Sequence, residues 1–248
     1  MTAGTPEVRV WFTRLCADPP GRMPQETKRR VRTATRRWVH ATVARWLAVP
    51  PRALRWERDD GGKPFVVARG RTVHLSYSHS DGVAGLALSE SAPVGLDVER
   101  VRERTHLEAL AHGCLSATEF AQWRRLPERT GPEGFCRLWT RKEAVLKAWG
   151  SGVPALLDRV GTALGSDGAP GPEDAQGSGG SAAVRIVQLP AELGPAAGWT
   201  VHEVPAPRGH LAAVAVRAAG ARVRMAGTLL STTEHDHMER SFPDVAHR

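Results

Sequence analysis

The sequence has few of the features that mark several large protein classes. It contains three cysteines, Cys16, Cys114 and Cys136, without a CxxC pair, so neither a disulfide framework nor a cysteine zinc site is indicated. Its longest apolar runs, such as residues 211–216, are too short to span a bilayer, and the N-terminus has no apolar segment of signal-peptide length. A cytoplasmic protein without membrane association is therefore predicted.

Signatures of ATP-driven and hydrolytic enzymes are also missing. The sequence has no Walker A loop, no GxGxxG and no kinase signature, which disfavours an ATP-dependent reaction. Ser78, His79 and Asp81 are too close in sequence to form a nucleophile–base–orienter triad, and no GxSxG elbow accompanies them. A serine hydrolase is therefore not predicted.

The chain is basic, yet poor in lysine. Its 34 Lys and Arg residues against 26 Asp and Glu give a net charge of +8, which favours anionic partners. An arginine-rich genome explains part of this charge, because all but four of the basic residues are arginine. The four lysines are Lys28, Lys63, Lys142 and Lys147, and each falls inside a motif discussed below.

The hydrophobic pattern predicts an α+β fold made of two similar halves, a pseudodimer in one chain. The first half, residues 1–101, has a helix at 24–47 among strands near 8–15, 53–57, 64–67, 72–76, 83–89 and 94–99. The second half, residues 102–220, has helices at 105–112, 117–125 and 133–149, then strands at 183–189, 198–204 and 210–217. Residues 165–181 are predicted to form a low-complexity loop, and residues 221–248 a disordered tail.

The segment "GLDVER", residues 95–100, places two acids on one face of a predicted strand. Apolar residues at 94, 96 and 98 alternate with Gly95, Asp97 and Glu99. One interpretation is a half-exposed strand with hydrated acids. The other is a pair of carboxylates that share a hard cation, with Gly95 leaving room for a ligand to approach.

The predicted helix at 133–149 contains "WTRKEAVLKAWG", in which Glu143 and Lys147 are four residues apart and therefore neighbours. As a surface pair they would contribute roughly 0.2–0.5 kcal/mol. Alternatively, Glu143 is a third carboxylate for the cation at Asp97 and Glu99. Oxygen ligands without Cys or His suit Mg²⁺ better than Zn²⁺, and Mg²⁺ commonly completes its shell with water and phosphate oxygens. A di- or triphosphate substrate is then expected.

Several polar residues are candidates for contacts with phosphate. Ser78 and His79 are predicted to end a strand and enter a turn, which is either an ordinary polar turn or an anion-binding one. Lys63, in "GGKPF", is either a solvated turn lysine or a phosphate ligand. Lys28 and Arg32 open the first helix, where a basic turn is either a solvated face or a site for a terminal phosphate.

Four short motifs occur in order: "GKP" at 62–64, "SHS" at 78–80, "GLDVE" at 95–99 and "WTRKEAVLK" at 139–147. In this order and spacing the sequence resembles the 4′-phosphopantetheinyl transferases of the surfactin-synthetase-activator type, over residues 8–219. The resemblance implies the pseudodimer fold of that family and a monomer. It also implies Mg²⁺-dependent transfer of the phosphopantetheine arm of coenzyme A to a conserved serine of an acidic apo acyl or peptidyl carrier protein, with release of adenosine 3′,5′-bisphosphate.

The resemblance further implies a role for each motif residue. The metal ligands on the coenzyme A pyrophosphate would be Asp97, Glu99 and Glu143, with Glu143 or a metal-bound water as the base. Lys147 would neutralise the pyrophosphate and assist the leaving group. The nucleotide and its phosphates would contact Lys63, Ser78, His79, Lys28 and Arg32, the last two at the 3′-phosphate.

The WxxKEA form resembles the broad-acceptor group that serves polyketide and nonribosomal peptide synthesis. The alternative is a non-catalytic basic module that binds nucleotide or nucleic acid. No nucleic-acid-binding fold signature is recognisable in the sequence, and a basic balance alone is weak support for such a module.

Overall fold

The computed structural model describes residues 5–16, 24–150, 154–164 and 182–227 of the 248-residue chain. Its first part contains β1 (Glu7–Arg14), α1 (Gln25–Trp46), β2 (Arg55–Arg58), β3 (Pro64–Ala68), β4 (Arg71–Ser80), β5 (Val83–Ser89) and β6 (Val94–Arg100). Its second part contains α2 (Leu107–Cys114), α3 (Ala117–Trp123), α4 (Gly131–Trp149), β7 (Gly161–Thr162), β8 (Ala182–Val184), β9 (Ile186–Gln188), β10 (Thr200–Val204), β11 (His210–Val216) and β12 (Arg222–Gly227). The mixture of helix and sheet confirms the predicted α+β class.

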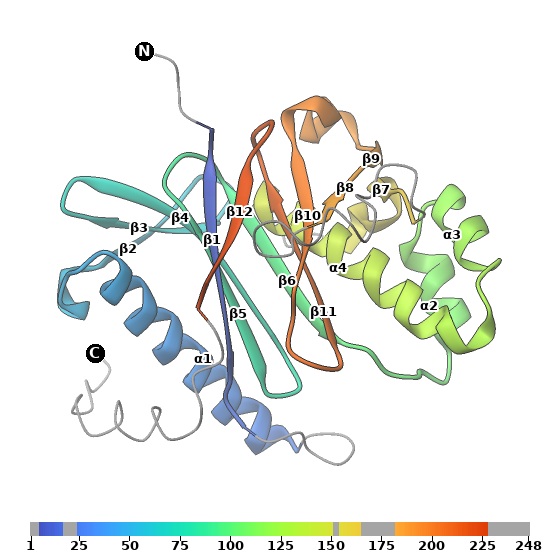
Figure 1. Cartoon of the computed structure of the whole chain (residues 1–248), viewed down its shortest axis with the longest axis horizontal. Coiled ribbons are helices and arrows are strands. Elements are labelled where there is room, and N and C mark those ends of the chain that lie inside the picture. Colours follow the sequence, from blue (N-terminus) through green and yellow to red (C-terminus); the bar gives the residue numbers. More distant parts are fainter. Residues whose placement is uncertain (1–4, 17–23, 151–153, 165–181, 228–248) are drawn as a thin grey trace.

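Two main sheets form the centre of the molecule (Figure 1). The larger sheet has the strand order β12-β1-β5-β4-β3-β2, and all its pairs are antiparallel except β1 with β12. The smaller sheet, β6-β11-β10-β8, is antiparallel throughout. A short pair, β7 and β9, stands apart from both.

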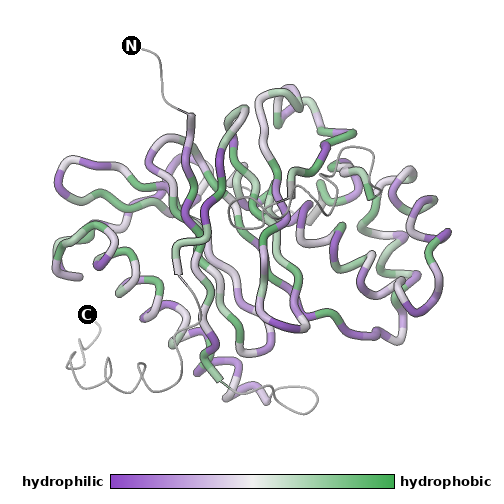
Figure 2. The backbone as a smooth tube through the Cα atoms, in the orientation of Figure 1, coloured by the Kyte–Doolittle hydropathy of each residue, from purple (hydrophilic) through white to green (hydrophobic). Residues whose placement is uncertain are grey.

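The helices cover the two outer faces of these sheets. Trp38, Val39 and Val43 of α1 pack against β3, β4 and β5, whereas α4 packs against β6 and β11. A third apolar layer fills the space between the sheets, where side chains of β1 and β5 meet those of β6, β10 and β11. Hydrophobic residues accordingly run along the central strands in Figure 2. Strand β6 therefore has one face against the larger sheet and one against α4.

Local sequence explains where the two long helices form and end. The buried residues of α1, such as Val31, Trp38 and Val43, fall on one face of the helix, and the chain leaves it at Leu47, shortly before Pro50. Helix α4 ends at Gly150, whose φ of 100° is readily adopted only by glycine. Within the described ranges, no helix is both long and apolar enough to cross a membrane.

The structure corrects the prediction at two places near the C-terminus. Residues 222–227 were predicted within a disordered tail, but they form β12, which pairs with β1 and packs Val223 and Met225 against the layer between the sheets. The strand predicted at 183–189 is instead two short strands, because β8 pairs with β10 and β9 pairs with β7. The loop predicted at 165–181 and residues 228–248 lie outside the described residues.

The division at residue 101 stays a prediction. Strand pairing crosses it twice, because β6 of the first half pairs with β11 and β12 pairs with β1.

Candidate active site

Strand β6 carries the two predicted metal-binding acids on the face that meets α4. Its apolar residues at 94, 96 and 98 are fully buried in the layer between the sheets. Alternation along the strand turns Gly95, Asp97 and Glu99 to the opposite face. Asp97 is 3% exposed and Glu99 is half-buried. The interpretation of a half-exposed strand with two hydrated acids is therefore wrong for Asp97.

Gly95 has a different role from the one predicted. A Cβ atom at this position would lie 1.9 Å from the Ala144 carbonyl oxygen and 2.4 Å from the Ala148 backbone nitrogen, both on α4. The missing side chain therefore lets the helix backbone approach the strand, and it does not leave room for a ligand. This close approach brings the C-terminal half of α4 onto Asp97.

We expect Gly95→Ala to destabilise the fold strongly. The added methyl group meets backbone atoms, which cannot rotate away, so the loss should reach the upper end of the roughly 1–3 kcal/mol that overpacking costs. Gly113→Ala in α2 is the matched control, because a Cβ there meets nothing within 4 Å. It should be neutral or stabilising by up to about 1 kcal/mol. Urea unfolding of the two variants measures both effects, and equal stabilities would contradict this role of Gly95.

Serine side chains of β4 connect this strand to β6. Ser78 Oγ donates to Asp97 Oδ1 at 2.8 Å, and Ser80 Oγ donates to Glu99 Oε2 at 2.9 Å. Backbone N–H groups of β6 donate in return to Ser76 and Ser80, from Leu96 at 3.0 Å and from Arg100 at 3.1 Å. The serines therefore hold both acids in place from the larger sheet.

Lys147 of α4 completes this arrangement. Its Nζ lies 2.5 Å from Asp97 Oδ1 and 3.1 Å from Ser78 Oγ. The other carboxylate oxygen, Asp97 Oδ2, is buried and has no hydrogen-bond partner in the described part of the chain. Since a buried carboxylate oxygen without a partner is costly, this atom is a position where a cation or a donor from a ligand would be favourable.

The two other acids are electrostatically linked to Asp97. Burial raises the pKa of Glu99 to about 6, and the nearby Asp97 carboxylate adds to this rise. Burial also raises the pKa of Glu143, with Asp97 acting in the same direction and Lys147 against it. Lys147 forms its ion pair with Asp97. The i,i+4 surface pair of Glu143 and Lys147 is therefore not the arrangement found here.

The three acids do not form a closed metal cage. Within the residues that the structure describes, no group of three or more His, Cys, Asp or Glu side chains is arranged to hold a metal ion. The oxygen donors of Asp97 and Glu99 still match the one or two carboxylates that Mg²⁺ commonly uses.

We expect Glu99→Gln to stabilise the metal-free protein, in a pH-dependent way. Because the pKa of Glu99 is raised in the folded state, the protonated carboxyl group favours folding. This contribution to stability is complete below the ordinary pKa of 4.5 and is lost as the pH rises through the folded-state pKa of about 6. At about pH 8 the substitution should therefore add on the order of 1–2 kcal/mol, and at about pH 4 nearly nothing. Chemical denaturation at both pH values, with chelator present, measures the difference. A gain of equal size at the two pH values would contradict the assigned cause.

Of the predicted phosphate contacts, Ser78 is part of this cluster and His79 follows it on β4. Ser78 and His79 belong to β4 itself, because the strand continues to Ser80 and the turn begins only at Asp81. Burial lowers the pKa of His79, and the charges of Arg32 and Lys147 lower it further, so both cations are within electrostatic reach of the ring. Lys28 lies one helical turn before Arg32 on α1.

Lys63 and Lys142 are both buried. Lys63 is 6% exposed, and its ammonium donates to the backbone carbonyl of Lys147. A contact of Lys63 with phosphate stays a prediction. Lys142 is fully buried and pairs with Glu119, which also accepts from the backbone N–H groups of Ser116 and Thr162. Lys142 therefore connects α3 and α4 in the core.

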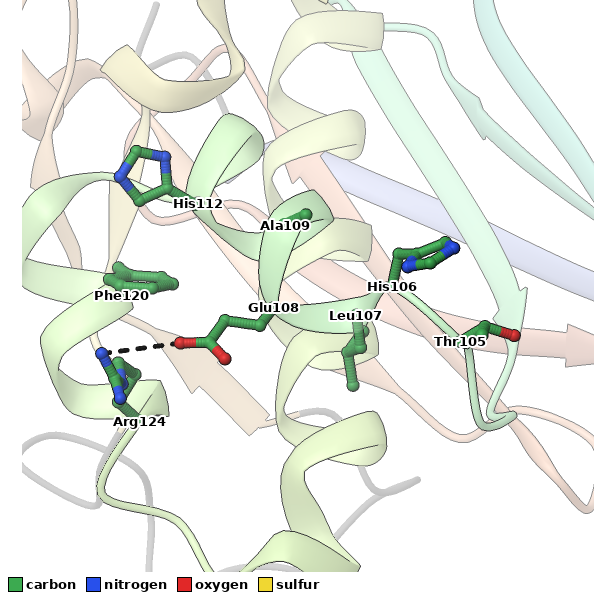
Figure 3. Close-up of a pocket in the computed structure, with 8 residues that line it drawn as sticks. All are labelled: Thr105, His106, Leu107, Glu108, Ala109, His112, Phe120 and Arg124. Carbon is green, nitrogen blue, oxygen red and sulfur yellow. Dashed lines mark ion pairs between the residues drawn. The ribbon is translucent and has the colours of Figure 1, made fainter.

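An open pocket lies elsewhere, beside α2 and α3 (Figure 3). It has a volume of about 550 Å³ and contains the pair of Arg124 with Glu108 at 3.5 Å. None of the predicted site residues lines it. The candidate site is therefore assigned from the cluster of Asp97, Ser78 and Lys147 and not from the size of a pocket.

Ser76 and Ser80 are the contributions that sequence reasoning missed. The alternation of serine at 76, 78 and 80 on one strand face was the available signal, because it has the same period as the acids on β6.

Comparison with known proteins relates part of this chain to one enzyme family. Residues 93–193, which include β6 and α4, match the family model of the 4′-phosphopantetheinyl transferase superfamily. The 4′-phosphopantetheinyl transferase HetI of Nostoc sp. (strain PCC 7120) is 33% identical over 138 residues, which cover 55% of this chain and 58% of HetI. Psf-1 of Bacillus pumilus is 33% identical over 122 residues, covering 49% of this chain and 50% of that protein. AcpT of Escherichia coli K12 is 32% identical over 137 residues, covering 53% and 65%.

The matched part of the chain spans between half and two thirds of the length of these relatives. All three carry the name 4′-phosphopantetheinyl transferase. The family model and these relatives together show that this part of the chain is similar to the 4′-phosphopantetheinyl transferase superfamily.

Proposed function

We propose that this protein transfers the 4′-phosphopantetheine arm of coenzyme A to a serine of an apo carrier protein. The serine oxygen forms a bond to the phosphorus next to the pantetheine, and the pyrophosphate P–O bond breaks. Adenosine 3′,5′-bisphosphate leaves, and the hydroxyl proton passes to a base. The observation that carries the proposal is the cluster of Lys147, Asp97 and Ser78 at the meeting point of α4, β6 and β4.

Mg²⁺ is the metal that the donors at this cluster fit. Asp97 Oδ2 is a buried oxygen without a partner among the described residues, and Glu99 is the next acid on the same strand face. These two carboxylates would hold the ion, with Glu143 as a further candidate from α4. When bound, Mg²⁺ would supply positive charge to the coenzyme A pyrophosphate.

The protein's own side chains would bind the substrate and move the proton. Glu143 is the candidate base, because a carboxylate whose pKa is raised by burial accepts a proton more readily than an ordinary one. Lys147 would place its ammonium beside the bridging oxygen, where negative charge grows as the bond breaks. His79, Arg32 and Lys28 would bind the nucleotide phosphates.

The partner that we propose is an acidic carrier protein, which suits the net charge of +8. The surfactin-activator type, with a broad range of polyketide and nonribosomal peptide carriers, is part of the proposal. The comparisons give no support to the alternative of a non-catalytic basic module.

Intact-mass spectrometry tests the proposal directly. Apo carriers from fatty acid, polyketide and nonribosomal peptide systems are incubated with the protein, coenzyme A and Mg²⁺. We expect at least one carrier to gain the mass of one phosphopantetheine group, with an equal amount of adenosine bisphosphate released. No gain on any carrier that a characterised transferase modifies in parallel would overturn the proposal.

A further inference from the structure

Lys63 is buried at the end of the helix that carries the catalytic candidates. The residue is 6% exposed, and its ammonium donates to the backbone carbonyl of Lys147. Burial lowers the pKa of Lys63 to about 8, with the charge of Lys147 adding to the effect and that of Asp59 opposing it. A lysine in this position is better placed to act inside the protein than to meet a phosphate arriving from solvent.

A tightly bonded turn presents Lys63 to the helix. The backbone N–H of Lys63 donates to Asp59 Oδ1 at 2.9 Å, and the backbone N–H of Asp59 donates to the Lys63 carbonyl at 3.0 Å. Gly62 N–H closes the turn on the Asp59 carbonyl at 2.8 Å, and Arg58 donates to the Gly62 carbonyl at 2.6 Å. The backbone that carries Lys63 is therefore held in place without help from α4.

The end of α4 needs a partner of this kind. The last carbonyl groups of a helix have no intrahelical donor, and a cation there also interacts favourably with the helix dipole. Among the described residues, the Leu146 carbonyl receives the N–H of Gly150 at 3.1 Å, and Lys63 supplies a donor to the Lys147 carbonyl. A Cβ at Gly150 would lie 3.3 Å from Lys63 Cβ, so the turn and the helix end are in close contact.

Lys147 is therefore held at both ends. Its backbone carbonyl binds Lys63, and its ammonium binds Asp97 and Ser78. If the last turn of α4 loosened, the Cα of Lys147 would move, and its ammonium would no longer be fixed on Asp97. The GKP motif at 62–64 is thus connected to the candidate site through a single residue, Lys147.

We infer that Lys63 is a positioning residue that acts through Lys147, by capping the last turn of α4 so that the Lys147 ammonium stays at the site. The inference rests on the proposed transferase function for its effect on turnover. It assigns the GKP lysine a role inside the protein in place of a contact with the nucleotide.

The test compares Lys63→Met with the control Arg58→Met. Lys63→Met removes the cap and leaves an apolar chain of similar length, whereas Arg58→Met removes a bond within the same turn that does not reach α4. In Lys63→Met we expect kcat to fall by about tenfold or more, because small displacements of a reacting group are costly. The KM for coenzyme A should change by less than about twofold, since no substrate contact is lost. Lys63→Gln, which keeps a donor, should lie between Lys63→Met and the unchanged protein.

A double-mutant cycle shows whether Lys63 acts through Lys147. In the Lys147→Ala background, Lys63→Met should lower kcat little further, because the group that it positions is already gone. A raised KM for coenzyme A with unchanged kcat would make Lys63 a substrate ligand and overturn the inference. Full additivity in the cycle would overturn it as well.

Amide hydrogen exchange tests the capping without any use of activity. In Lys63→Met the backbone amides at 146–150 should exchange faster than in the unchanged protein, and in Arg58→Met they should not. Unchanged exchange at 146–150 would overturn the inference even if the protein is a transferase. A failure of the proposed function would instead leave the exchange result intact and abolish turnover in every variant.

Discussion

Asp97→Asn is expected to remove nearly all phosphopantetheine transfer while the protein stays folded. The substitution keeps an oxygen that Ser78 and Lys147 can bind, at 2.8 and 2.5 Å in the present structure. It removes the charge that would hold Mg²⁺ and replaces Oδ2, which has no partner among the described residues, with an NH₂ group, which repels a cation. We expect a loss in kcat/KM of roughly 10²–10³-fold, comparable to the removal of a central electrostatic contact in other enzymes.

Two measurements accompany the activity assay. Titration with Mn²⁺ should show weaker binding in Asp97→Asn, whereas a thermal melt should show little loss of stability. Glu57→Gln is the matched control, because Glu57 is an exposed acid on β2 whose ion pair is with Arg55, so the same charge is removed outside the cluster. Full transfer by Asp97→Asn, or full transfer by the unchanged protein in excess chelator, would rule out a metal at this carboxylate.

Glu143→Ala is expected to lower kcat by roughly 10²-fold or more, because it removes the proposed base and a proposed metal ligand together. Lys147→Ala should also act mainly on kcat, since its charge matters most when the pyrophosphate bond breaks. Lys147→Arg should restore little of the kcat that Lys147→Ala loses, because a planar guanidinium does not fit the compact position between Asp97 and Ser78. Steady-state kinetics with varied coenzyme A measure these effects.

The same helix supplies the control for these variants. Glu133 lies in the first turn of α4 and pairs with Arg137 four residues later, at 2.8 Å and with its side chain half exposed. Glu133→Ala should cost only a few tenths of a kcal/mol and leave turnover unchanged, as is usual for an exposed i,i+4 pair. If Glu143→Ala and Lys147→Ala behaved like Glu133→Ala, the helix would have no catalytic role.

The sequence alone determined those features that follow from local periodicity. Alternation along residues 94–99 was sufficient to place Asp97 and Glu99 on one face and the apolar residues on the other, because successive side chains of a strand point to opposite faces. The apolar stripe of α1 and the glycine after α4 were likewise sufficient to predict these helices, which end at Trp46, one residue before the predicted end, and at Trp149, as predicted. The order of the four motifs was enough to suggest the family that the comparisons support.

Only the tertiary structure decided how these elements meet, because contacts between distant segments have no local signature. Glycine is needed at position 95 because a Cβ atom there would lie 1.9 Å from a backbone oxygen of α4. No neighbouring residue in the sequence indicates this contact. Strand β12 forms because β1 offers a free edge, although the pattern of residues 222–227 is weak. Lys63 and Lys147 are 84 residues apart in sequence, and only the packing of the 59–63 turn on α4 makes one the cap of the other.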